Sequence, residues 1–199
     1  MLNQIRSLYY TVYLKLRGAK VGKSVEFGGA FKVVLRDGAS YKNIEIGNNV
    51  TFSGETFLRL RKGGKLKIDE NVNVGVHVWL VVANTSILHL KKNVILGSYC
   101  ILNGGHGITI GENSWFAAFV YLNTSDHQIR KGILIQQQGY DGFPISIGQD
   151  NWVGGHVFIN KNVKTGTGVV VGSGSVVTKS IPDNAVVVGN PARILKYRE

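Results

Sequence analysis

"ISIGQD NWVGGH VFINKN VKTGTG VVVGSG SVVTKS", residues 145–180, divides into units of six residues. An aliphatic or β-branched residue holds the third place of each unit: Ile147, Val153, Ile159, Thr165, Val171 and Val177. A side chain at this period stays on one side of a β-strand but drifts around a helix, because six is a multiple of 2 and not of 3.6. The glycines and asparagines that recur after these residues suit corners, including corners with positive φ. Three units per turn therefore predict a triangular coil of short strands with the aliphatic side chains inside.

The same unit recurs upstream, so the repeat covers most of the chain. Its earlier copies begin at Val21, Ile46, Ile68, Val74, Leu90, Leu96, Ile110 and Phe116. Ile46, Ile68 and Leu90 are 22 residues apart instead of 18, which predicts four extra residues at one corner of those coils. We expect one all-β domain over residues 1–199, with a β-solenoid at 20–181 and a protruding loop at 123–144. Residues 182–199 should leave the coil after Pro182 and fold back.

The N-terminal residues 1–17 carry a helical pattern of apolar side chains. Leu2, Ile5, Tyr9, Val12 and Leu16 share one face of that helix, which we expect to pack on the open end of the solenoid. The aromatic and basic residues of the segment also favour a second interpretation, contact with a membrane surface.

Composition fits a globular domain, with 44% hydrophobic and 18% charged residues. The chain has no apolar run of the roughly 18–20 residues that span a bilayer, and its N-terminus lacks the layout of a signal peptide. One cysteine, Cys100, fits a reducing compartment, so we expect the protein in the cytoplasm. The net charge of +11 predicts an anionic partner. Basic residues cluster at Arg59, Arg61, Lys62, Lys65 and Lys67.

The six-residue period breaks between Leu122 and Pro144. A coil of fixed period cannot absorb these residues, so they should form a loop outside it, and long loops on repeat scaffolds are commonly functional. His127 lies at the start of this loop, and a histidine accepts a proton near neutral pH. The residues alone leave two interpretations open, a hydrogen-bonded loop histidine and a general base.

Three runs in the second half of the chain resemble the hexapeptide-repeat O-acetyltransferases of the galactoside, xenobiotic and surface-polysaccharide types. The runs are DHQIRKG, FPISIGQDNWVGGHVFI and VVVGSGSVVTKSIPDNAVVVGNPARIL. The resemblance implies a left-handed parallel β-helix, although right-handed crossovers are the general rule. It also implies acetyl-CoA as co-substrate and a homotrimer with active sites between subunits.

The resemblance assigns a role to particular residues. It makes His127 the general base that takes a proton from an acceptor hydroxyl, and it turns the backbone N–H of Gly155 toward the thioester. Asp126, next in the chain, is a candidate to orient the histidine. The residues expected to bind acetyl-CoA are Trp152, Gly155, Gly172, Ser173, Thr178, Lys179, Arg193 and Lys196.

The acceptor is expected to be a sugar hydroxyl of a bacterial surface or capsular glycan, and the positive charge favours an acidic one. The residues expected to bind it are Asn103, Asp126, Arg130, Lys131 and Trp152. A small xenobiotic and a nucleotide-linked sugar are alternative acceptors. Trp79 and Trp115 are expected to be packing residues.

Two other classes of protein compete with this interpretation. A metalloenzyme like the γ-class carbonic anhydrases needs a close pair of histidines, but His77, His106 and His127 lie far apart in the sequence. The second class is a non-catalytic solenoid with a basic face for nucleic acid, but the sequence contains no recognised nucleic-acid motif and its charge is scattered. We therefore expect neither a metal ion nor a nucleic-acid partner.

Overall fold

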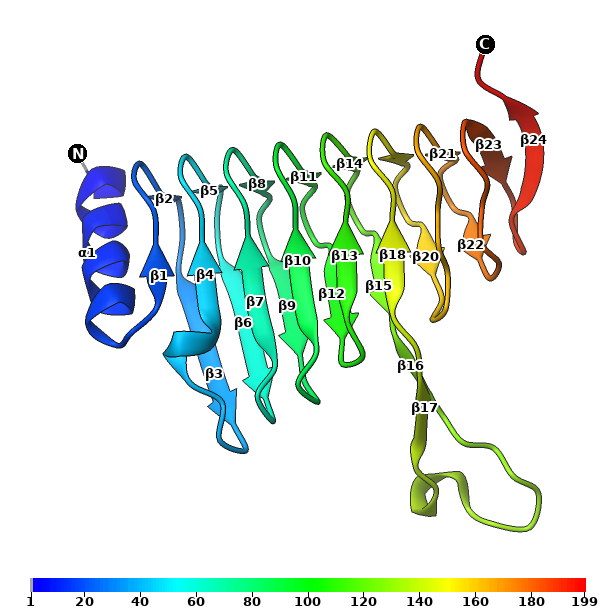
Figure 1. Cartoon of the computed structure of the whole chain (residues 1–199), viewed down its shortest axis with the longest axis horizontal. Helices are drawn as coiled ribbons and strands as arrows, with labels where there is room; N and C mark the ends of the chain where they lie inside the picture. The colour runs from blue at the N-terminus through cyan, green and yellow to red at the C-terminus, as the bar shows by residue number, and fades with distance from the viewer. Residues whose placement is uncertain (1) are drawn as a thin grey trace.

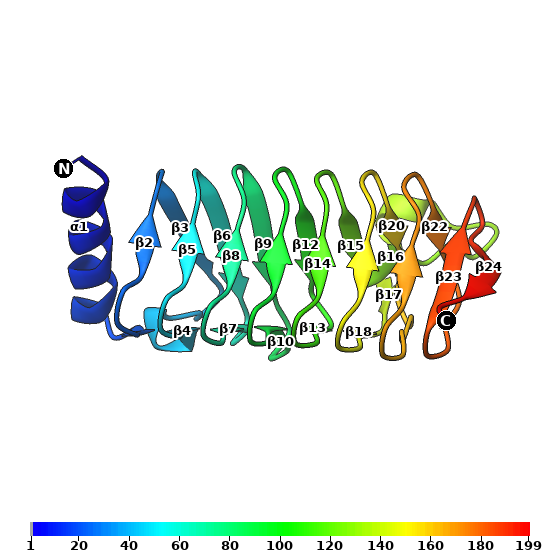
Figure 2. The same cartoon turned by 90° about the horizontal axis from the view of Figure 1, so that it is seen from above.

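A computed structural model describes residues 2–199 as one helix followed by a long triangular prism of stacked coils (Figures 1 and 2). The helix is α1 (Leu2–Leu16), and two 3-10 turns are η1 (Tyr41–Asn43) and η2 (Ile135–Gln137). Each of the first six coils contributes one short strand to each of three sheets, in which neighbouring coils pair in parallel. No helix within residues 2–199 has the length and apolar character needed to cross a membrane.

The strands are grouped by sheet. The first sheet, A, contains β1 (Lys20–Val21), β4 (Ile44–Ile46), β7 (Lys65–Ile68), β10 (Ile87–Leu90), β13 (Ile108–Ile110) and β18 (Ile145–Ile147). Sheet B contains β2 (Glu26–Phe27), β5 (Thr51–Phe52), β8 (Asn73–Val74), β11 (Ile95–Leu96), β14 (Trp115–Phe116), β19 (Trp152–Val153), β21 (Val170–Val171), β23 (Ala185–Val188) and β24 (Arg193–Tyr197). Sheet C contains β3 (Phe31–Arg36), β6 (Thr56–Arg61), β9 (Val78–Val82), β12 (Ile101–Gly104), β15 (Tyr121–Asn123), β20 (Phe158–Ile159) and β22 (Val176–Val177). A separate pair is β16 (Ser125–His127) and β17 (Tyr140–Gly142).

The predicted aliphatic row lies inside the prism and sets the register of the strands. On sheet A the aligned partners are Val21, Ile46, Ile68, Leu90, Ile110 and Ile147, and all six are buried. Because each strand uses alternate residues for the interior, a slip of one residue would expose the whole row. The fold is the left-handed parallel β-helix that the family resemblance implies. The 22-residue coils are confirmed, with their extra residues between sheets C and A.

The corners differ from the prediction in one respect. Positive φ occurs at later corner positions, among them Asn49, Asn71, Asn93 and Asn113, whose side chains form a ladder of hydrogen bonds of 2.8–3.2 Å from coil to coil. The glycines that follow the aliphatic residues have ordinary φ and serve another purpose. A Cβ on Gly148 would lie 2.1 Å from the carbonyl oxygen of Gly166 in the next coil, so glycine is needed there for close stacking.

Helix α1 covers the open end of the first coil, and the predicted helix is confirmed over residues 2–16, residue 1 being outside the described residues. The predicted packing face is wrong. Leu14 is fully buried, with Tyr10 and Tyr13 half-buried beside it, whereas the expected face, Leu2, Ile5, Tyr9, Val12 and Leu16, is 45–83% exposed. The helix has two apolar faces, and the one with two tyrosines packs because their rings join the core while the Tyr13 hydroxyl bonds that of Tyr41 at 3.0 Å.

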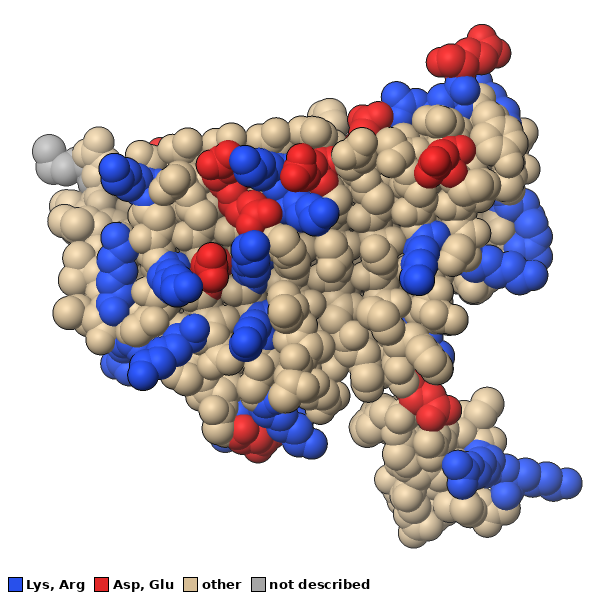
Figure 3. All heavy atoms as spheres, viewed as in Figure 1, with Lys and Arg blue, Asp and Glu red and all other residues tan. Residues whose placement is uncertain are grey.

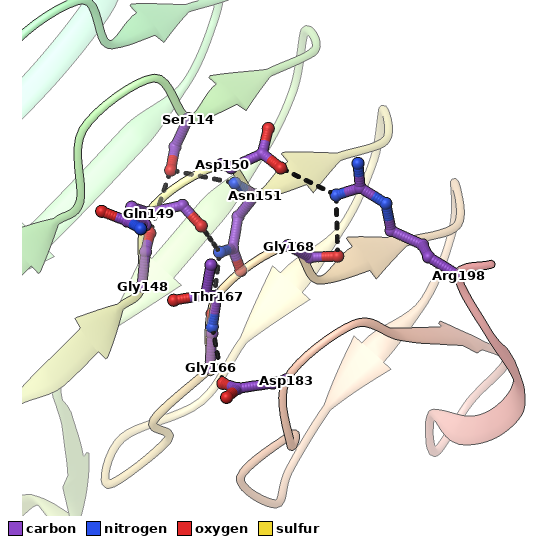
Figure 4. Close-up of polar contacts among 10 residues, drawn as sticks. All are labelled: Ser114, Gly148, Gln149, Asp150, Asn151, Gly166, Thr167, Gly168, Asp183 and Arg198. Atoms are coloured by element: carbon purple, nitrogen blue, oxygen red, sulfur yellow. Dashed lines mark hydrogen bonds and ion pairs between the residues drawn. The ribbon is translucent and has the colours of Figure 1, made fainter.

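The C-terminal segment stays in the coil longer than predicted. Strand β23 pairs in parallel with β21, so the chain leaves the prism after Val188 and not after Pro182. It then folds back as β24, antiparallel to β23. An ion pair of 2.9 Å between Arg198 and Asp150 ties this last strand to an earlier coil (Figure 4).

Candidate active site

Residues 124–144 leave the prism as an arm, which begins at the end of β15 and returns to the coil at β18 (Figure 1). Its two strands, β16 and β17, pair in an antiparallel ladder. None of residues 125–144 is buried. His127 is the last residue of β16, and its ring lies 4.2 Å, centroid to centroid, from that of Tyr140 on β17. Within residues 2–199 the exposed imidazole of His127 has no hydrogen-bond partner, so both ring nitrogens are free to meet a substrate.

The base of the arm is held by side chains from three successive coils. The Asn103 amide donates a hydrogen bond of 2.9 Å to Asn123, which in turn donates one of 2.7 Å to the carbonyl oxygen of Ser125. Asn103 therefore fixes the strand that carries His127. Its binding of the acceptor stays a prediction. Asp126, the candidate to orient His127, instead forms an ion pair of 2.9 Å with Lys161 of the next coil.

A second histidine lies beneath the arm. His106 is half-buried, its backbone N–H donates to the hydroxyl of the buried Thr124, and its Nδ1 is buried without a partner among residues 2–199. Gly142 of β17 passes directly over this ring, because a Cβ at that position would lie 2.0 Å from the ring atoms. The direction in which the arm leaves the prism is therefore limited by the contact between His106 and Gly142.

The NWVGG turn is anchored by a buried asparagine (Figure 4). The Asn151 amide donates to the carbonyl oxygens of Gln149 and Gly166, at 2.8 and 2.9 Å, and its oxygen accepts from the Thr165 hydroxyl at 2.8 Å. With every polar atom of this side chain satisfied, the corner that presents the exposed Trp152 is rigid.

The predicted sites for the acetyl-CoA arm lie at stacked corners of neighbouring coils. Gly155 accepts a hydrogen bond of 2.9 Å from Gly174, which places residues 154–155 beside residues 173–174. The N–H groups of Gly155 and Ser173 have no partner among the described residues, whereas the N–H of Gly172 donates to Val187 at 2.8 Å. Gly155 and Ser173 can thus donate to a ligand, but Gly172 can offer only its carbonyl oxygen.

The remaining predicted cofactor residues gather at the C-terminal end. Lys179 and Arg193 line the same hollow of about 230 Å³, whose walls are Val177, Ser180, Ile181, Val187, Ala192 and Ile194. Thr178 is exposed beside Lys179, and Lys196 lies on β24 opposite Val186. Two cations on one apolar hollow fit an anionic group with an attached organic body. No contact joins these residues to His127 within the described part of one chain.

The basic cluster predicted from the sequence is divided by a corner. Arg59 and Arg61 project from sheet C, whereas Lys65 and Lys67 belong to sheet A. Arg61 pairs with Asp37 at 3.2 Å, and Lys67 pairs with Asp69 at 3.5 Å. Figure 3 shows a further group of cations at the tip of the arm, where Arg130 and Lys131 have no ion-pair partner among residues 2–199.

Two other expectations can be compared with the structure. Trp79 packs on the ring of Phe57, 4.2 Å between centroids, as predicted, but 43% of it stays exposed, and Trp115 is exposed by 57%, so the prediction of a packing residue is wrong for Trp115. Both lie on outward-facing strand positions, where an aromatic residue must be covered by another molecule or remain in water. Burial raises the pKa of the Cys100 thiol to about 11, which leaves this cysteine protonated and unreactive at neutral pH. No group of three or more potential metal-ligand side chains occurs within residues 2–199.

Sequence reasoning missed four residues of the site: Asn123, Tyr140, His106 and Lys161. A pattern was available for Asn123, because it occupies the position of Asn103 one coil later, and the two are register partners. Tyr140 and Lys161 reach the site through the pairing of β16 with β17 and through coil stacking, which the hexapeptide period does not specify.

Comparison with known proteins places this geometry in a family. No protein-family model matches the chain. The chain is 33% identical over 127 residues to galactoside O-acetyltransferase of Escherichia coli K12, and the match covers 62% of each protein. It is 30% identical over 145 residues to the putative lipopolysaccharide biosynthesis O-acetyl transferase WbbJ of the same organism, covering 69% of this chain and 74% of WbbJ.

Solved structures agree on the fold. The polySia specific acetyltransferase NeuO matches with a TM-score of 0.60 and 24% identity, over 90% of this chain and 85% of NeuO. A galactoside acetyltransferase in complex with coenzyme A matches with a TM-score of 0.54 and 28% identity, over 68% of this chain and 64% of that one. The repeat, the arm and the similarity to WbbJ over 74% of its length lead to one conclusion: the chain belongs to the hexapeptide-repeat O-acetyltransferase family.

Proposed function

We propose that the protein is an acetyl-CoA-dependent O-acetyltransferase that modifies a sugar hydroxyl of a bacterial surface glycan, with His127 as general base. The observation that carries this proposal is the position of His127 on β16, a strand outside the filled prism that is held by its pairing with β17. The His127 side chain is exposed and has no hydrogen-bond partner among residues 2–199. A prism packed with aliphatic side chains has no interior room for a substrate, so its chemistry must lie outside.

The proposed reaction needs one base and one group of hydrogen-bond donors. An imidazole nitrogen of His127 takes the proton of the acceptor hydroxyl as its oxygen bonds to the acetyl carbon. The carbon–sulfur bond of the thioester then breaks, and the proton passes to the departing sulfur. Negative charge that develops on the thioester oxygen requires a fixed donor, and the N–H of Gly155, free of intrachain partners, has the right chemistry.

Acetyl-CoA fits the residues that the coils present. Gly155 and Ser173 offer free N–H groups at stacked corners, and Lys179 with Arg193 offers two cations on one hollow for phosphates. The galactoside acetyltransferase matched above was solved with coenzyme A, which supports the same ligand for this chain. Trp152 presents an exposed ring beside these corners for the ligand or the acceptor.

We propose further that the site is completed by a second subunit of a homotrimer. His127 contacts none of the cofactor residues of its own chain, and an exposed aromatic column runs along the prism. Its rings are His77, Tyr99, Phe119 and His156, stacked 4.7–5.1 Å apart, with Trp79 beside them. Apolar surface of this extent is a common mark of a protein interface. Tyr99→Glu should therefore convert the oligomer to smaller species in analytical ultracentrifugation and abolish turnover, whereas an unchanged mass would contradict the interface.

An acidic acceptor is the finer proposal. Arg130 and Lys131, unpaired at the tip of the arm, give it a cationic surface beside His127. Turnover can be followed by release of the free thiol with a panel of neutral, acidic and amino sugars and polysaccharides. Arg130→Gln with Lys131→Gln should raise KM for an acidic acceptor and make it less sensitive to salt. Equal activity on neutral and acidic glycans would contradict the proposal of an acidic acceptor and leave the proposed acetyl transfer untouched.

The general base is tested by His127→Ala. Turnover should fall by about 10²- to 10⁴-fold, with coenzyme A binding retained, because the base acts on the acceptor. His89→Ala is the matched control, since His89 lies on sheet A and bonds Asp69 at 2.9 Å. Full activity of His127→Ala would rule out the proposed role.

A further inference from the structure

The outward face of α1 is an apolar surface that nothing in the described chain covers. We name it the outer stripe, and its members are Leu2, Ile5, Leu8, Tyr9, Val12 and Leu16, all of them 45–83% exposed. The helix lies across the end of the prism, so this stripe forms the end of the molecule (Figures 1 and 2). A contiguous exposed apolar surface of this kind marks an interaction site.

Cations border the outer stripe, and anions are missing from it. Residues 2–25 contain Arg6, Lys15, Arg17, Lys20 and Lys23 but no aspartate or glutamate. At 3.6 residues per turn, Lys15 lies beside the Leu8 edge of the stripe, and Arg6 lies beside the opposite edge. Figure 3 shows lysine and arginine side chains next to the largely uncharged α1 end.

Most of these cations are available to a partner. Lys15 and Lys23 form no ion pair within residues 2–199, and the pair between Lys20 and Glu45 is long, at 3.8 Å, and exposed. The Arg17 guanidinium lies 4.4 Å from the centre of the Tyr13 ring, which keeps its charge at the end of the helix. The face is therefore both apolar and positively charged.

We propose that α1 docks the protein on an anionic lipid surface, with the outer stripe in the interfacial region and the cations among the headgroups. Apolar burial and attraction to anionic lipids add in this mode of binding, and Tyr9 suits the boundary between headgroups and chains. A second copy of this chain is a poorer occupant, because two such faces would bring unpaired cations together. The prism then stands away from the lipid surface, with the arm above it.

Flotation of the full-length protein with lipid vesicles tests this proposal. Vesicles of phosphatidylcholine mixed with phosphatidylglycerol should bind the protein, those of phosphatidylcholine alone should bind it much less, and added salt should weaken the binding. Leu8→Gln with Val12→Gln should lower the vesicle-bound fraction by about tenfold or more. Lys15→Gln with Lys23→Gln should lower it by about tenfold.

Matched substitutions on the prism show whether vesicle binding depends on the outer stripe or on exposed apolar side chains in general. Ile87→Gln with Ile95→Gln removes two exposed apolar side chains from sheets A and B and should leave vesicle binding unchanged. Absence of binding to the mixed vesicles would overturn the proposal, as would equal binding by the stripe variants. A change in the sedimentation of the free stripe variants, with vesicle binding intact, would instead identify the stripe as a contact between copies. Acetyl transfer to a dissolved acceptor is independent of all these outcomes.

Discussion

The coils and the arm are held in place by different kinds of contact. In the coils, an aliphatic side chain enters the interior about every six residues, and each strand pairs with one above and one below. In the arm, residues 125–144 bury no side chain, and the two strands pair only with each other. The arm is held at its base, by Asn123, Lys161 and the contact of Gly142 with His106. The proposed general base therefore lies on a segment whose geometry depends on a few contacts, whereas the stability of the prism depends on many.

The largest predicted difference concerns apolar side chains. Leu80→Ala removes a fully buried side chain of β9 and should lower the free energy of unfolding by about 2–5 kcal/mol, because it leaves a cavity in the prism. Ile135→Ala removes an exposed side chain of the arm and should change it by less than about 0.5 kcal/mol. Denaturant unfolding of both variants measures the contrast, and similar losses would show that the arm has a core of its own.

Cys100 provides a pH-dependent test of the prism alone. Because burial raises the pKa of the thiol to about 11, the folded chain keeps a proton that the unfolded chain loses above pH about 9. Stability should therefore be fully present below that pH and fall by about 2–3 kcal/mol as the pH rises toward 11. Cys100→Ala should flatten this part of the curve, and alkylation of native Cys100 should be slow. Rapid alkylation would mean that the coils open as readily as the arm.

The base of the arm is tested by a pair of glycines. Gly142→Ala places a methyl group against the His106 ring and should displace β17, lowering turnover by about 10- to 100-fold with little loss of stability. Gly139→Ala is the control in the same arm, because its nearest neighbour, the side chain of Gln128, is 3.6 Å from the new atom. The double variant with His106→Ala should recover activity. If activity does not recover, the contact between Gly142 and His106 does not determine the position of His127.

The smallest effect is expected at the ion pair between Lys161 and Asp126. Both side chains are partly exposed, so Asp126→Asn should cost less than about 1 kcal/mol and depend on salt. The change should appear as faster amide hydrogen exchange in β16 and β17. Glu70→Gln, which breaks the 2.7 Å pair with Lys92 on the prism, should leave exchange in the arm unchanged.

The sequence predicts the coils well because their period is local. Ile46, Ile68 and Leu90 are separated by whole coils, and they align as register partners as expected. The face of α1 could not be predicted, since Tyr10, Tyr13 and Leu14 form a second apolar face of similar spacing. His127 was located by a break in the period, but its neighbours Lys161 and Tyr140 come from stacking and from strand pairing. Those contacts depend on three-dimensional distance, which the six-residue pattern does not encode.

The stack of coils also acts as a spacer of fixed step. Four steps of about 4.8 Å lie between the first coil, on which α1 packs, and the fifth coil, so the arm leaves β15 roughly 19 Å from the coil that α1 covers. Since each coil meets only its two neighbours, removal of one 22-residue turn between Ile46 and Ile68 would lower the arm by one step and leave its own surroundings intact. The number of coils thus sets the distance between α1 and the arm that carries His127, the proposed general base.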